Sequence, residues 1–225
     1  MSETKARVPE SRSGMLKITE IFHSLQGEAR DAGRPSVFVR LTGCPLRCQY
    51  CDSEYAFYGG DWMSFDDIEV EIGKHGTPYV CVTGGEPLAQ KRCVELLDHL
   101  VWAGYRVSLE TSGAMDISGV DPRVSRVLDL KTPGSGEVER NLWSNLEQLT
   151  PHDQIKFVIC SDEDFDWAVE QVCGRGLAKR CEVLFSPSWG QMDARRLAER
   201  VLEAQLPVRV QLQLHKLLWG DVPGK

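Results

Sequence analysis

The sequence predicts an α/β protein built on parallel βα units. Apolar runs of strand length recur along the chain, and helix-like segments lie between most of them. Many of these runs are continuously apolar, as expected when helices cover the outer face of a sheet and another layer fills the inner face. A closed eight-unit barrel usually needs about 250 residues. Because this chain has 225 residues, we expect an incomplete (partial) TIM-type barrel of about six parallel βα units.

The expected elements follow from hydrophobic runs and from capping residues. Strands are expected at 18–22, 36–41, 79–83, 106–109, 124–130, 154–160, 182–185 and 208–214. Helices are expected at about 64–75, 88–103, 161–173 and 190–206. Ser64 and Ser161 are typical N-cap residues followed by acidic residues, and Gly104 is expected to end the second helix. In such folds the chemistry lies at the C-terminal ends of the strands.

Composition indicates a single domain at 15–225 preceded by a polar, mobile leader at 1–14. The hydrophobic and charged fractions, 42% and 26%, are ordinary for a soluble globular protein. A net charge of −7 with no lysine or arginine run argues against a nucleic-acid partner. No run is long enough to span a membrane and no signal sequence is present, so we expect a reducing, cytoplasmic location. The scattered cysteines are then expected to be packed free thiols: Cys81, Cys93, Cys160, Cys173 and Cys181.

Three further cysteines, Cys44, Cys48 and Cys51, share one loop with the spacing Cys-x3-Cys-x2-Cys. Three thiolates can hold three irons of a 4Fe-4S cluster and leave the fourth iron open to a ligand. A structural zinc site would need four ligands, usually from two knuckles, and the sequence has no second knuckle. A redox pair of Cys48 and Cys51 would leave Cys44 without a role. The cluster is therefore favoured over zinc and over a redox pair.

A second motif, Thr83-Gly84-Gly85-Glu86-Pro87, follows the strand at 79–83. Glycines at a strand end let the backbone approach a ligand, although a plain turn into the next helix is the alternative. Together with the cysteine loop, this motif resembles the radical S-adenosylmethionine superfamily. The resemblance implies one 4Fe-4S cluster whose open iron binds S-adenosylmethionine. It also implies a 5′-deoxyadenosyl radical that abstracts a substrate hydrogen.

Segments 22–28, 40–44, 110–113 and 213–216 resemble the 7-carboxy-7-deazaguanine synthase (QueE) family, over about residues 16–216. This resemblance implies a carbon–nitrogen lyase that converts 6-carboxy-5,6,7,8-tetrahydropterin to 7-carboxy-7-deazaguanine and ammonia, a ring contraction in 7-deazapurine and queuosine biosynthesis. It further implies a homodimer and an electron donor such as flavodoxin or ferredoxin. A glycyl-radical-enzyme activase and a non-catalytic zinc-binding module are the competing hypotheses.

The resemblance also implies a set of substrate contacts. They are Leu25, Gln26, Gly27, Glu28, Arg40, Thr83 and His215. Gln26 and Glu28 could recognise the donors and acceptors of the pterin edge, and Arg40 could bind its carboxylate with a planar fork. The alternatives are loop surface for the first two and a strand-end ion pair for Arg40. We expect His215 to project from the last strand toward the same rim.

Further residues are implied to bind the cofactors. For S-adenosylmethionine they are Tyr50, Cys51, Asp52, Gly85, Glu110, Ser112, Asp129, Leu130, Lys131 and, with a weaker signal, Ser186. Ser53 stands where the family often has threonine, and its hydroxyl is a suitable Mg²⁺ ligand. Serine lacks the methyl group that restricts the threonine rotamer, so we expect poorer preorganisation. In some relatives the chain end reaches the active site, which makes Pro223 and the terminal carboxylate candidates for that position.

Overall fold

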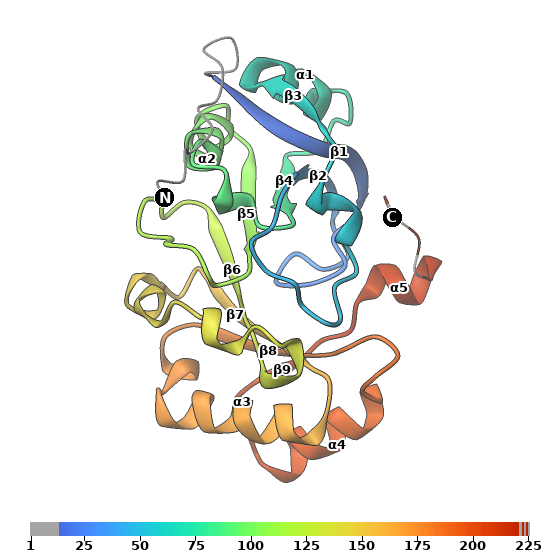
Figure 1. Cartoon of the computed structure of the whole chain (residues 1–225), viewed down its shortest axis with the longest axis vertical. Helices are drawn as coiled ribbons and strands as arrows, with labels where there is room; N and C mark the ends of the chain where they lie inside the picture. The colour runs from blue at the N-terminus through green and yellow to red at the C-terminus, as the bar shows by residue number, and fades with distance from the viewer. Residues whose placement is uncertain (1–13, 221, 223, 225) are drawn as a thin grey trace, which may run out of the picture.

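The computed structural model describes residues 14–220, 222 and 224, and within them it has one nine-stranded sheet (Figure 1). The strand order is β3-β1-β2-β4-β5-β6-β7-β8-β9. The strands are β1 (Met15–Leu25), β2 (Pro35–Leu41), β3 (Asp61–Ser64), β4 (Tyr79–Gly84), β5 (Arg106–Thr111), β6 (Ser125–Leu130), β7 (Gln154–Ile159), β8 (Glu182–Pro187) and β9 (Arg209–Val210). The expected leader, except Gly14, and Pro223 lie outside the described residues.

The strands from β2 through β4 to β9 run parallel, and β3 and β9 stand at opposite edges of the sheet. The sheet therefore does not close, which confirms the predicted partial barrel. The first strand differs from the prediction, because β1 is longer than 18–22 and pairs antiparallel with both β2 and β3. The short connection at 26–34 explains this pairing, since a parallel partner would need a longer crossover.

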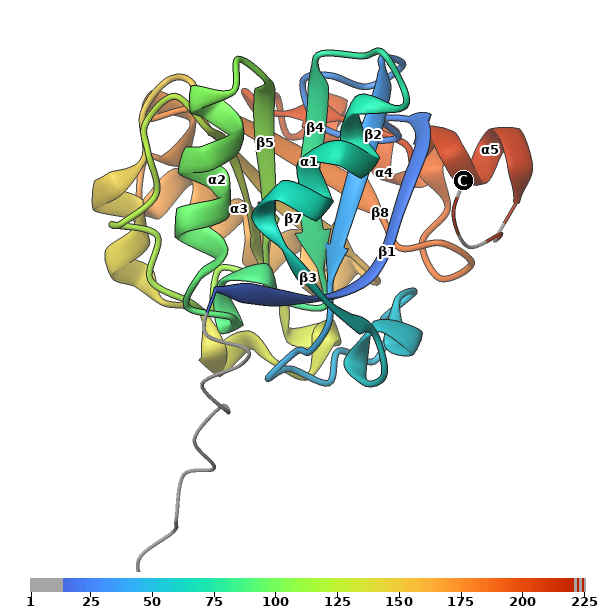
Figure 2. The ribbon, with the colours of Figure 1, turned by 90° about the horizontal axis from the view of Figure 1, so that it is seen from above.

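Four helices of this part of the chain accompany the parallel strands, two near each end of the sheet (Figures 1 and 2). They are α1 (Phe65–Gly73), α2 (Cys93–Trp102), α3 (Asp162–Gly174) and α4 (Ala194–Glu203). The predicted N-caps are confirmed: the Ser64 hydroxyl accepts from the Asp67 amide and the Ser161 hydroxyl from the Asp164 amide. No helix among the described residues is long and apolar enough to cross a membrane.

The hydrophobic core lies between these helices and one face of the sheet. Alternate strand residues such as Val80 and Val82 pack there with Leu96 and Leu97 of α2 and with Phe165 of α3. Side chains of a strand alternate between its two faces, so the intervening residues point to the other side of the sheet. The core therefore occupies one face of the parallel strands, and the side chains on the opposite face do not belong to it.

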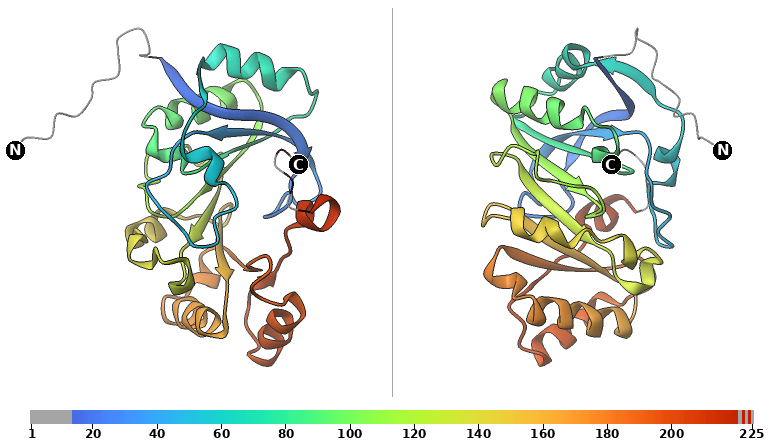
Figure 3. Two further views of the ribbon diagram at one scale, coloured as in Figure 1. Left: turned by 45° about the vertical axis from the view of Figure 1, so that its right-hand side comes forward. Right: turned by 60° about the vertical axis from the view of Figure 1, so that its left-hand side comes forward.

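The predicted strand at 208–214 is largely wrong. Only Arg209–Val210 pairs with β8, and the chain then forms the helix α5 (Leu214–Trp219). The Leu214 amide donates to the Gly27 carbonyl (3.0 Å) rather than to a sheet neighbour, which takes the backbone out of the ladder. Figure 3 shows α5 apart from α3 and α4, beside the end of β1. His215 consequently lies on a helix and not on the last strand.

A buried ion pair lies near the N-terminal ends of the neighbouring strands β6 and β7. Arg126 donates from Nε to Asp153 Oδ1 (2.9 Å) and from Nη2 to Oδ2 (2.6 Å), and both side chains are at most 4% exposed. The Asp153 carboxylate also accepts from the Thr150 amide (2.8 Å). Removing one partner of such a pair leaves an uncompensated buried charge.

We predict that Arg126→Met lowers the free energy of unfolding by about 3–5 kcal/mol, because Asp153 would stay buried without its cation. Urea denaturation measures the change. Arg123→Met is the matched control, since its ion pair with Asp121 is exposed on the arginine side, and its effect should be much smaller. Equal losses in the two variants would contradict the role of burial.

Candidate active site

A cavity of about 440 Å³ lies on the sheet face opposite the helix-packed core. Arg40 points into it from between the core residues Val39 and Leu41 of β2. Lys156 of β7 does the same from between Ile155 and Phe157. The cavity is thus built by the strand residues that the core does not use, together with the cysteine loop and α5.

The cysteine loop forms one wall, and Cys44, Cys48 and Cys51 all line the cavity. Backbone bonds fix the loop at both ends: the Gly43 amide donates to the Ala56 carbonyl (2.8 Å), and the Gln49 amide donates to the Ser135 carbonyl (3.0 Å). Burial raises the pKa of Cys44 and raises that of Cys48 to about 11. Metal binding must therefore displace protons from these thiols.

The two glycines of Gly84-Gly85-Glu86-Pro87 allow the end of β4 to abut this loop. A Cβ atom on Gly84 would lie 2.4 Å from the Leu41 carbonyl oxygen, and one on Gly85 would lie 2.6 Å from that of Gly43. Glu86 is fully buried and accepts from the Ser112 amide (2.7 Å), which fixes Ser112 in the cavity wall. The motif is therefore a close-packing device at this strand end, besides being a turn.

A cluster of charges fills the floor of the cavity. The Lys156 ammonium lies 2.7 Å from Glu28 Oε2, 3.5 Å from Asp129 Oδ2 and 3.6 Å from Glu110 Oε2. Lys131 Nζ lies 3.1 Å from the same Asp129 oxygen. Burial raises the pKa of Glu110 to about 7; Lys156 opposes the shift, while Glu28 and Asp129 reinforce it. Glu110 therefore titrates near neutral pH.

The residues expected to bind substrate share one end of the cavity. Gln26 is buried, and its Oε1 accepts from the Glu28 amide (3.3 Å). Arg40 donates from Nε to Glu20 Oε1 (2.7 Å), so the ion pair that was the alternative for this residue is present. Since that pair uses Nε, a ligand carboxylate would have to bind the Nη groups of Arg40.

Helix α5 closes the cavity from the C-terminal side. A Cβ atom on Gly27 would lie 2.0 Å from His215 Nδ1, so the imidazole occupies the space that a side chain would need. Burial lowers the pKa of His215, and the ring is therefore neutral at pH 7. Lys216 Nζ lies 3.0 Å from Asp52 Oδ2. Burial opposes ionisation of Asp52, but this lysine outweighs it and lowers the Asp52 pKa.

The cavity gathers nearly all of the predicted site residues. Every expected substrate contact lines it, as do the three cysteines, Ser53 and all but two of the residues expected to bind S-adenosylmethionine. The exceptions are Leu130, whose alternation places it in the core, and Ser186, which is buried two residues before the cavity residue Ser188. Sequence reasoning missed Lys156, although a lone charge inside an apolar strand was a usable signal.

Two buried polar atoms of residues in the cavity wall lack a hydrogen-bond partner within the described part of the protein. Among the described residues, neither Asp129 Oδ1 nor the Tyr50 hydroxyl has a hydrogen-bond partner. Buried polar groups are normally satisfied, so these atoms are suited to meet polar groups of a bound molecule. The three loop cysteines that line the same cavity are the type and number of donors that a cluster with one open iron needs. The residues present therefore fit a 4Fe-4S cluster and S-adenosylmethionine.

Comparison with known proteins agrees with this chemistry. Residues 38–130 match the radical SAM superfamily. A 7-carboxy-7-deazaguanine synthase from Chlorobaculum tepidum is 42% identical over 93% of this chain and 97% of that protein. The synthase from Koribacter versatilis is 44% identical over 91% and 97%, and that from Thermoplasma acidophilum 39% identical over 93% and 100%.

Solved structures resemble the fold. QueE from Escherichia coli has a TM-score of 0.73 at 23% identity and covers 93% of this chain and all of its own. Streptococcus suis SuiB, solved with S-adenosylmethionine bound, has a TM-score of 0.50 at 16% identity over 76% of this chain and 44% of its own. Since the sequence relatives match almost end to end, the chain belongs to the 7-carboxy-7-deazaguanine synthase family of radical S-adenosylmethionine enzymes.

Proposed function

We propose that this protein is a lyase that converts 6-carboxy-5,6,7,8-tetrahydropterin to 7-carboxy-7-deazaguanine with release of ammonia, in 7-deazapurine and queuosine biosynthesis. The observation that carries the proposal is a single cavity lined both by the three loop cysteines and by Gln26, Glu28 and Arg40. A radical generated at the cysteine loop would form beside a polar, carboxylate-binding recess. The family of the chain supports the same reaction.

Cys44, Cys48 and Cys51 would hold one 4Fe-4S cluster. When bound, the cluster and S-adenosylmethionine would supply the one-electron reduction that starts radical chemistry. Asp129 Oδ1 would accept a hydrogen bond from the S-adenosylmethionine, and the Tyr50 hydroxyl and Lys131 would contribute to the same binding site. Gly85 packs against Gly43 and Cys44 of the cysteine loop and lines the cavity, so its backbone would lie along the cofactor.

The substrate binds at the Gln26 end. Glu28 accepts from the N–H groups of the pterin edge, and the Gln26 amide has both donors and acceptors for its remaining positions. The Nη groups of Arg40 bind the substrate carboxylate, while Glu20 holds Nε and orients the guanidinium. Thr83 and neutral His215 complete the wall of the cavity at this end.

The residues of this cavity fit the two competing hypotheses, an activase and a zinc-binding module, less well. A glycyl-radical-enzyme activase acts on a protein partner and has no need of the buried Gln26 and Glu28 pair. A zinc-binding module has no use for a lined cavity with unpartnered polar atoms in its wall. The proposal includes a reductant such as flavodoxin or ferredoxin and a homodimer, by family resemblance, and a cytoplasmic location, which suits eight free cysteines.

Anaerobic turnover tests the reaction. With reductant, Mg²⁺ and S-adenosylmethionine, the carboxytetrahydropterin should yield 7-carboxy-7-deazaguanine and ammonia, followed by liquid chromatography and mass spectrometry. Cys48→Ser should lose cluster iron and product because it removes a cluster ligand, whereas Cys173→Ser, at an exposed cysteine, should keep both. Formation of 5′-deoxyadenosine without any deazaguanine would leave a radical enzyme with a different substrate.

Ser53 is the proposed Mg²⁺ ligand, and its hydroxyl lies 3.4 Å from Asp52 Oδ1 in the cavity wall. Ser53→Thr keeps the oxygen and restricts its rotamer, so we predict equal or higher activity and half-maximal stimulation at equal or lower Mg²⁺. Ser53→Ala should abolish the stimulation. A Thr variant without activity, or an Ala variant still stimulated by Mg²⁺, would show that the hydroxyl is not a ligand.

Glu110 should make stability depend on pH in the protein without S-adenosylmethionine or substrate. A carboxyl whose pKa is raised to about 7 favours the folded state below the ordinary glutamate pKa, and this contribution is lost as pH rises through 7. Urea denaturation should therefore show that, between about pH 5 and 8, the free energy of unfolding of the wild type falls by up to about 3 kcal/mol relative to that of Glu110→Gln.

The exposed Glu199 provides the control for this pH dependence, because its carboxylate stays in contact with water in the folded protein. The stability difference between the wild type and Glu199→Gln should stay constant over the same range. A constant difference for Glu110→Gln as well would mean that Glu110 is ionised throughout.

A further inference from the structure

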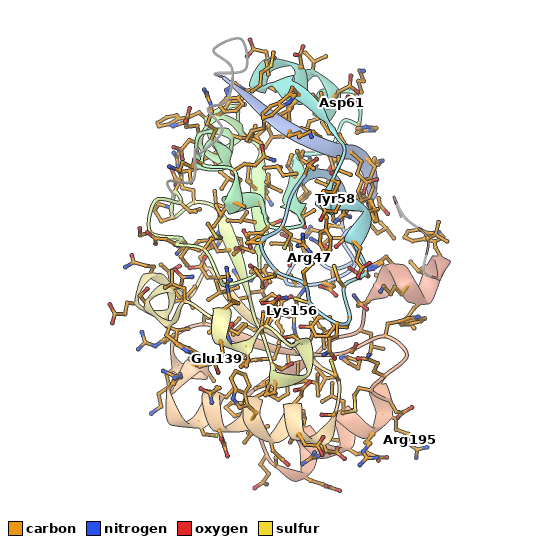
Figure 4. The ribbon with its side chains drawn as sticks, viewed as in Figure 1. Arg47, Tyr58, Asp61, Glu139, Lys156 and Arg195 are labelled. Carbon is orange, nitrogen blue, oxygen red and sulfur yellow. The ribbon has the colours of Figure 1, made fainter. Side chains whose placement is uncertain are left out.

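Lys156 is a buried cation on a central strand of the sheet. Its neighbours Ile155 and Phe157 belong to the apolar core, so its side chain points into the cavity. Figure 4 shows it toward the middle of the molecule, whereas the exposed Arg195 lies at the periphery. The side chain is 10% exposed. A buried ammonium is costly unless partners compensate it, so its contacts indicate what it does.

The three carboxylates around Lys156 are not equivalent. Asp129, its register partner on β6, has a second cation in Lys131 at 3.1 Å. Glu110 is the most distant of the three, at 3.6 Å. Glu28 forms the shortest contact, a 2.7 Å hydrogen bond, and among the described residues no other lysine or arginine nitrogen lies within 4.0 Å of it. Glu28 and Glu110 therefore share Lys156 as their one basic partner within 4.0 Å among the described residues, and Glu28 is the one in direct hydrogen-bond contact with it.

We propose that Lys156 is a positioning residue for the substrate, whose ammonium keeps Glu28 ionised and aimed into the cavity as a hydrogen-bond acceptor. This inference rests on the proposed function, in which Glu28 receives N–H groups of the pterin. Without the ammonium, Glu28 would face two other carboxylates in a low-dielectric space and would take up a proton. A protonated Glu28 loses part of its capacity to accept.

Glu110 shows the effect of burial on a carboxyl of this cluster. Burial, with Glu28 and Asp129 nearby, raises its pKa even though Lys156 opposes the shift. Other ionisable groups line the same cavity: neutral His215, which interacts electrostatically with Glu28, Lys216 and Asp52, and Arg40, which is paired with Glu20. Lys216 is paired with Asp52, so it does not replace Lys156.

The test measures ligand binding without turnover. Cluster-loaded enzyme is titrated anaerobically, without reductant, with the carboxytetrahydropterin and separately with S-adenosylmethionine in a calorimeter. Lys156→Met should raise the pterin Kd at least about tenfold at about pH 6.5. It should change the Kd for S-adenosylmethionine by less than about threefold, because Lys131 still neutralises Asp129.

The pH dependence of pterin binding distinguishes a charge effect of Lys156 on Glu28 from simple filling of space by the lysine side chain. In the variant Glu28 is protonated at low pH and ionises as pH rises, so the ratio of variant to wild-type pterin Kd should fall between about pH 6 and 8.5. A constant ratio would overturn the proposal, as would equal losses for the two ligands. Lys156→Gln, which keeps a donor without the charge, replaces Lys156→Met if the latter does not fold.

Two matched variants complete the experiment. Lys156→Arg keeps the positive charge and should recover pterin binding relative to Lys156→Met, whereas failure to recover any would count against the role of charge. Lys179→Met, at an exposed lysine that does not line the cavity, should bind both ligands as the wild type does. A wild type that binds no pterin would refute the proposed function itself. Equal pterin binding by the wild type and Lys156→Met would refute only the role of Lys156.

Discussion

Alternation of side chains along the parallel strands is the constraint on which the rest of this molecule depends. Leu128 and Leu130 point toward the helices, and Asp129 between them points into the cavity. The same division in each strand lets one face carry the apolar core while the other carries charges. Because buried ion pairs add little net stability, the apolar face must hold the fold together. The charged face can then be arranged for binding.

Close packing at the strand ends holds the cysteine loop against the ends of β4 and β5. The end of β4 packs so closely that Gly84 has no room for a side chain beside Leu41 at the end of β2, and Gly85 has none beside Gly43 and Cys44 of the cysteine loop. Glu86 then extends the contact to Ser112 on the next strand end. The cluster ligands and the charged floor are consequently held by main-chain contacts and by one buried carboxylate, rather than by long flexible side chains.

Local patterns predicted much of this, and long-range contacts account for what they missed. The spacing of Cys44, Cys48 and Cys51 and the N-cap at Ser64 are readable over a few residues. Lys156 looks like an interruption of an apolar run, because its partner Glu28 lies 128 residues away. The error at His215 has the same origin: residues 208–214 have strand composition, but the partner of the Leu214 amide is the Gly27 carbonyl near the other end of the chain.

The docking of α5 also has a consequence for how the protein is made. His215 fills the space above Gly27, and Lys216 reaches Asp52, so the last helix closes a cavity whose other walls come from earlier segments. During synthesis these walls leave the ribosome first. A nascent chain that has completed β8 already contains the cysteine loop and the residues of the charged floor, but not the helix that packs over Gly27. The α5 wall of the cavity can therefore form only after residues 214–216 have left the ribosome.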